Sequence, residues 1–108
     1  MIGKFLGKIT FAEFGKVSDY PFLVGLQLSF SMGGACVSCG GKYTVNLHKD
    51  CRWEEKERET AITVSIDKLN AILTDAKANY VSELKGKPVE VTVEDNTFKD
   101  FRILTEVI

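Results

Sequence analysis

The stretch FLVGLQLSF, residues 22–30, alternates between apolar and small or polar side chains more cleanly than any other part of the chain. Strict alternation is typical of a β-strand with one buried face, because successive side chains point to opposite sides of a sheet. We therefore expect a half-buried strand here and a sheet around it. Its apolar face would carry Phe22, Val24, Leu26, Leu28 and Phe30.

Two further stretches predict strands near the first. Upstream, KFLGKITFAEF at residues 4–14 places Phe5, Ile9 and Phe11 on one face. The segment GKVSDYP, residues 15–21, has the glycine, aspartate and proline of a turn, so we expect these two strands to pair as a hairpin with a long loop. Downstream, KYTVNL at residues 42–47 alternates again and predicts a third strand.

The hydrophobic period changes from residue 52 onward. Apolar residues then recur at spacings of 4, 3, 4, 3 and 4, which predicts an amphipathic helix over residues 52–78. Asp50 is the expected N-cap, and the glutamates that follow suit the positive end of the helix dipole. Leu69 and Leu73 are expected to lie buried beneath this helix. The stripe consists of Ile62, Ile66, Leu69, Leu73, Ala76 and Tyr80.

The carboxyl-terminal segment predicts a second hairpin. Residues 89–94, VEVTVE, alternate between valine and polar side chains, and Asp95 and Asn96 tolerate the positive φ angles of a tight turn. Phe101, Ile103 and Val107 mark the returning strand.

Together these elements predict a single α+β domain over residues 1–108, in the order β-β-β-α-β-β. We expect one antiparallel sheet of about five strands with one long helix packed on one face. The other face would carry apolar residues among polar ones, which indicates a homo-oligomer or, equally, scattered exposed side chains. These residues are Leu6, Leu23, Leu104 and Ile108.

Charge and composition limit the classes of partner. With 14 basic and 15 acidic residues the formal charge is −1, so the basic stripe of a protein that binds extended nucleic acid is missing. No apolar run is long enough to cross a bilayer, and the start has no signal-peptide pattern. Three cysteines, an odd number, favour the reducing cytoplasm.

All the cysteines and the single histidine fall within residues 36–51. Cys36, Cys39, His48 and Cys51 have the ligand types of a tetrahedral Cys3His zinc site. The predicted strand at residues 42–47 spans roughly 20 Å and would hold the two ligand pairs apart. We therefore favour a protein without zinc or any other cofactor, and a zinc-stabilised structural module is the alternative.

The glycines around the cysteines indicate a second kind of site. Glycine-rich turns can present backbone N–H groups to an anion, and the polar face of the strand that follows would add charge and hydrogen bonds. The alternative is a hairpin loop whose glycines serve only the turn. No catalytic constellation is evident, so we expect a binding protein and not an enzyme. The candidate ligand-binding residues are Gly33, Gly34, Gly40, Gly41, Lys42, Thr44 and Asn46, closed by Arg52 or Trp53.

Several stretches resemble a family of small uncharacterised proteins from phages and prophages of bacteria. They are AEFGKVSDYPFLVGLQLSF, GGKYTVN, CRWEEKERETAI and KGKPVEVTVEDNTFKDFRILTEVI, which together cover most of the chain. The resemblance implies a protein that acts in the host cytoplasm by binding, against host defence. Such proteins include homo-oligomeric sponges for nucleotide immune signals, and a protein–protein inhibitor of a host factor is the alternative.

Overall fold

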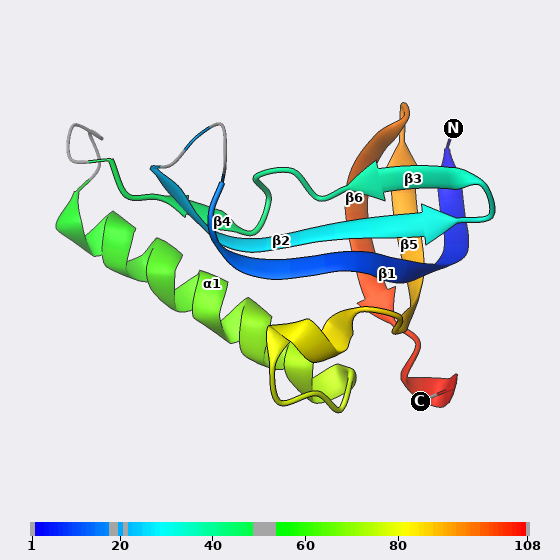
Figure 1. The fold of residues 1–108 in the computed structure, drawn as a ribbon. Helices are drawn as coiled ribbons and strands as arrows, with labels where there is room; N and C mark the ends of the chain where they lie inside the picture. The colour runs from blue at the N-terminus through cyan, green and yellow to red at the C-terminus, as the bar shows by residue number, and fades with distance from the viewer. Residues whose placement is uncertain (1, 18–19, 21, 49–53, 108) are drawn as a thin grey trace.

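The computed structural model describes residues 2–17, 20, 22–48 and 54–107 (Figure 1). Six strands, one α-helix and two short 3-10 helices follow one another along the chain in the order β-β-β-β-α-β-β, with the 3-10 helices η1 and η2 after α1 and β6. The elements are β1 (Gly3–Lys16), β2 (Leu23–Met32), β3 (Ala35–Ser38), β4 (Thr44–Asn46), α1 (Glu55–Asp75), η1 (Val81–Leu84), β5 (Pro88–Glu94), β6 (Thr97–Ile103) and η2 (Thr105–Val107).

The predicted α+β class with one antiparallel sheet and one long helix is confirmed. The sheet has the strand order β3-β2-β1-β5-β6, and β4 pairs with β2 beside β3. The prediction lacked β3, which forms a hairpin with β2 through Gly33 and Gly34. Both glycines have positive φ, 57° and 98°, and two such residues suit the two-residue turn that joins paired strands.

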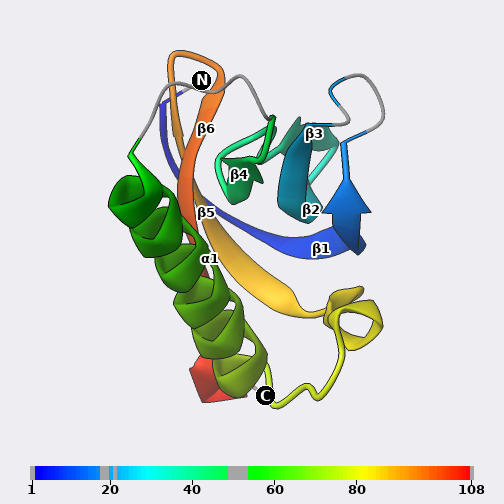
Figure 2. The ribbon, with the colours of Figure 1, turned by 90° about the vertical axis from the view of Figure 1, so that its left-hand side faces the viewer.

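Strand β1 joins the two halves of the sheet. Its residues Gly3–Lys8 pair with β5, whereas Lys8–Lys16 pair with β2. A register shift between Ile9 and Phe11 marks the change of partner, and such a bulge bends a strand. The sheet curls so that the two halves enclose the core between them (Figures 1 and 2). Phe30 of β2 stacks on Phe98 of β6 with 5.3 Å between the ring centroids.

Helix α1 is shorter at both ends than predicted. It begins after Glu54, and the expected N-cap Asp50 lies outside the described residues. It ends in a Schellman motif, because Lys77 has a φ of 54° while Ala78 N–H donates to the carbonyl of Leu73 at 2.9 Å. Glycine usually occupies this left-handed position, so the lysine gave no stop signal in the sequence.

Only the carboxyl-terminal half of α1 reaches the core. Ile72 and Ala76 are buried there, and Leu69 and Leu73 pack against the core half-buried, less deeply than predicted. The other half runs beside β4, past the curled part of the sheet (Figures 1 and 2). The remaining members of the stripe lie at the surface: Ile62 is 40% exposed, Ile66 50% and Tyr80 70%.

The carboxyl-terminal hairpin is confirmed. Asp95 and Asn96 form its turn with φ angles of 50° and 61°, and the three valines of β5 are buried. The returning strand ends at Ile103, earlier than predicted, and Val107 is exposed in η2. In the described part of the chain no helix combines the length and apolar character needed to cross a membrane.

Candidate functional site

The two glycine pairs of the predicted anion cradle lie at opposite ends of β3. Gly33 and Gly34 form the β2–β3 turn, and Gly40 and Gly41 form the turn between β3 and β4. Positive φ angles at Gly33, Gly34 and Gly40 account for these glycines by backbone conformation alone. The structure therefore does not bring the four glycines together around one ligand.

The thiols and the histidine also point to different places. Cys39 is buried, and its Sγ accepts the N–H of Leu28 at 3.2 Å, whereas Cys36 is exposed on β3. Burial raises the pKa of the Cys39 thiol, which opposes the thiolate that zinc requires. The His48 ring lies edge-on to the Phe22 ring, with 5.7 Å between the ring centroids. Cys51 lies outside the described residues. Among the described residues no group of three His, Cys, Asp or Glu is placed to hold a metal ion.

The predicted polar face of β4 is partly occupied by local hydrogen bonds. Thr44 Oγ1 donates to the Gly41 carbonyl at 2.7 Å, and Asn46 Oδ1 accepts the N–H of His48 at 2.9 Å. Lys42 Nζ donates to the Lys99 carbonyl of β6 at 2.6 Å. Lys42 therefore joins the turn before β4 to the edge of β6. The predicted closing residues Arg52 and Trp53 lie outside the described residues.

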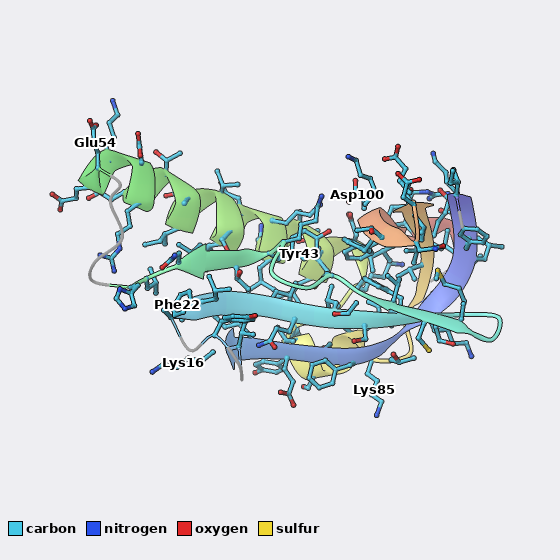
Figure 3. All side chains as sticks on the ribbon, turned by 90° about the horizontal axis from the view of Figure 1, so that it is seen from above. Lys16, Phe22, Tyr43, Glu54, Lys85 and Asp100 are labelled. Atoms are coloured by element: carbon cyan, nitrogen blue, oxygen red, sulfur yellow. The ribbon has the colours of Figure 1, made fainter. Side chains whose placement is uncertain are left out.

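Tyr43 fills the space between β6 and the neighbouring strands. Its ring meets Phe98 and Phe101 edge-to-face at 6.2 Å and 6.1 Å, and Lys68 Nζ lies 5.7 Å from its centroid. Tyr43, which Figure 3 labels, is only 9% exposed. Its hydroxyl has no hydrogen-bond partner among the described residues. Burial, and then the nearby charge of Asp100, raises the pKa of this hydroxyl, although Asp100 accepts no hydrogen bond of ordinary geometry from it.

A groove of about 420 Å³ lies between β4 and the exposed half of α1. Two lysines from distant parts of the chain share it with three side chains that carry hydroxyls, while most of its surface is apolar. We call it the α1–β4 groove, and its lining residues are Lys42, Tyr43, Thr44, Val45, Ala61, Val64, Ser65 and Lys68. Of the predicted site residues it includes Lys42 and Thr44.

A smaller hollow of about 120 Å³ also lies along this half of α1. It shares Val45 and Ser65 with the α1–β4 groove and is otherwise apolar. The exposed side chains of Ile62 and Ile66 face it from the helix. We call it the Phe14 hollow, and its remaining lining residues are Phe14, Val24 and Leu47.

The side chains of the α1–β4 groove can bind an anion. Lysine ammonium groups and hydroxyls donate hydrogen bonds to phosphate or carboxylate oxygens. The described lining residues include no carboxylate, thiol or imidazole to serve as a general base. Comparison of the chain with family models, with curated proteins and with solved structures finds no match.

Proposed function

We propose that this chain is a non-enzymatic binding protein that holds a small anionic ligand in the α1–β4 groove. One observation carries the proposal: Lys42 and Lys68, from different elements, line the same largely apolar groove. A volume of about 420 Å³ lies within the range of small-molecule sites, which combine apolar walls with a few polar groups that fix orientation.

The chemistry of the groove favours an anion with a flat apolar body, such as a nucleotide. Val45, Ala61 and Val64 would pack against the base, while the two lysines would pair with a phosphate. The resemblance to phage proteins suggests a purpose for such binding. A phage protein that sequesters a nucleotide immune signal would protect the phage in the host cytoplasm.

Calorimetric titration with a panel of cyclic and linear nucleotides tests this proposal, after native mass spectrometry has shown what co-purifies. We expect Lys68→Ala to weaken binding at least tenfold, or about 1.4 kcal/mol, without a loss of thermal stability. Lys8→Ala is the matched control, because Lys8 is exposed on β1 and is not among the residues that line the groove.

Two results would contradict the proposal. If no nucleotide binds at micromolar protein concentration, a host protein becomes the better candidate for the partner. If Lys68→Ala and Lys8→Ala weaken binding equally, the attraction comes from general charge and not from the groove.

A further inference from the structure

Along its second half, one edge of β1 has no neighbouring strand among the residues that the structure describes. Pairing with β5 ends at Lys8, and Ile9 then exchanges hydrogen bonds with Lys87 and Gly86 at 3.1 Å and 2.7 Å. From Ala12 to Lys16 the strand pairs with β2 on one side only. In Figure 2, β4 and α1 lie on one side of β2 and the end of β1 lies on the other side, with η1 next to β1.

The hydrogen bonds of β2 show which β1 groups point to this edge. Leu26 N–H donates to the Tyr43 carbonyl, and the Leu28 carbonyl accepts the N–H of Cys39, so both residues face away from β1. Their cross-strand partners are Phe14 and Ala12. Because residues opposite each other in an antiparallel ladder either bond to each other or both point away, Phe14 and Ala12 direct their N–H and C=O groups outward. No described residue pairs with these groups.

Apolar side chains accompany the unpaired backbone groups. Phe14 is 45% exposed on the helix side of the sheet, and Phe11 is 42% exposed on the other side. Open edges usually carry protection against pairing with another chain, such as a very short strand, charges or a covering loop. Here the edge is several residues long, and its exposed charges are Glu13 and Lys16.

We infer that this edge pairs with the same edge of a second copy, so that two sheets join into one across a twofold axis at Phe14. In an antiparallel pair related by such an axis, residues that face each other lie on the same side of the joined sheet. Centring the pair on Phe14 places the two Phe14 rings opposite each other. Ala12 then lies opposite Lys16, and Glu13 opposite Gly15.

Two registers shifted toward the start of β1 are less favourable. Centring on Glu13 would place two carboxylates directly opposite each other at about 4.5 Å between Cα atoms, and like charges there are destabilising. Centring on Ala12 would place Phe14 opposite Thr10, within the bulge that interrupts the ladder. The inferred dimer is a property of the edge of β1, and it goes beyond ligand binding in the α1–β4 groove.

Sedimentation equilibrium tests the inference through the mass in solution. For the unmodified protein we expect twice the chain mass of 12.0 kDa. For Phe14→Lys we expect the mass of a single chain, because two lysines would then lie directly opposite each other across the twofold axis. The matched control is Leu6→Lys, because Leu6 is 69% exposed on the outer face of β1, where the strand is paired with β5. A monomeric unmodified protein would overturn the inference. A dimer that survives Phe14→Lys but not Leu6→Lys would also overturn it, in favour of association through the outer face.

Amide hydrogen exchange by NMR tests the same edge without any substitution. The amides of Ala12 and Phe14 should be protected at high protein concentration and exchange faster on dilution. The amides of Glu13 and Gly15 are internal controls, because they point toward β2 and should be protected at every concentration. Rapid exchange of Ala12 and Phe14 at all concentrations would exclude the paired edge.

Discussion

Gly25 lies directly opposite Gly15 in the β1–β2 ladder, but only Gly25 is pressed against another strand. A Cβ atom added at Gly25 would collide with the carbonyl oxygen of Tyr43 and come within 2.6 Å of the Thr44 Cα, whereas one added at Gly15 would meet nothing within 4 Å. The missing side chain at Gly25 therefore lets β4 approach β2 and sets one wall of the α1–β4 groove.

We expect Gly25→Ala to lower the free energy of unfolding by about 1–3 kcal/mol, the usual cost of overpacking. The obstacle is backbone, which cannot move aside as a flexible side chain would. Urea denaturation measures the effect, and Gly15→Ala is the matched control, with an expected change within about 0.5 kcal/mol. Equal losses for both variants would show that β4 is not held closely against β2.

Tyr43→Phe should raise the free energy of unfolding by about 1 kcal/mol, because it removes a buried hydroxyl that has no hydrogen-bond partner among the described residues. Tyr20→Phe is the control, since Tyr20 is 56% exposed and should show no change. Thermal and urea denaturation at neutral pH measure both variants. A loss of stability in Tyr43→Phe would mean that the hydroxyl has a hydrogen-bond partner.

The same hydroxyl predicts a decline in stability at alkaline pH. Burial, and then Asp100, raises the pKa of Tyr43 in the folded protein above its ordinary value of 10.0. The unfolded chain therefore ionises first. The stability that the neutral Tyr43 hydroxyl contributes is fully present below pH 10, and it is lost as the pH rises through the pKa of Tyr43 in the folded protein. We expect the free energy of unfolding, measured from pH 8 to pH 11, to fall less steeply above pH 10 for Tyr43→Phe than for the unmodified protein. Identical slopes would contradict the raised pKa of Tyr43.

Truncation along α1 should separate its two halves. Ile72→Ala should lower the free energy of unfolding by about 2–5 kcal/mol. Ile72 is only 4% exposed, so its truncation leaves a cavity in the core. Ile66→Ala, the same substitution at a residue that is 50% exposed, should cost less than about 1 kcal/mol. Urea denaturation compares the two variants, and similar losses would place the whole helix against the core.

The two described thiols should differ in reactivity. Cys36 is exposed on β3, whereas Cys39 is buried and burial raises its pKa, so iodoacetamide should modify Cys36 in the folded protein and Cys39 only after unfolding. Peptide mapping by mass spectrometry distinguishes them, and a denatured sample provides the control in which both react. Modification of Cys39 as fast as Cys36 would show that the turn before β4 opens readily.

Alternation along the chain was enough to predict most of the sheet. The apolar positions of β2 and β5 repeat every second residue, and the Asp95–Asn96 turn has recognisable chemistry. Strand β3 was not predicted because its four residues, which lie between two glycine pairs, are too few to show a period. The helix stripe identified residues that share a face, but periodicity does not reveal how far the sheet beneath extends. The exposure of Ile62 and Ile66 therefore could not be predicted from the stripe.

The α1–β4 groove could be predicted only in part. Lys42 and Thr44 were identified because they lie on the polar side of an alternating strand. Lys68 and Ser65 gave no local signal, since their position beside Lys42 depends on the angle at which α1 crosses β4. Tyr43 was correctly expected on the apolar side, but its unpartnered hydroxyl follows from the packing of Phe98 and Phe101, which are distant in the sequence.

The division of β1 between two partners sets an order of events during protein synthesis. Its second half can pair with β2 soon after both leave the ribosome, because β2 is the next strand along the chain. Its first half must wait for β5, which is translated only after β2, β3, β4 and α1. The nascent chain therefore carries Phe5 on an unpaired strand until β5 has been translated, and chaperones that bind exposed apolar segments have that interval in which to act.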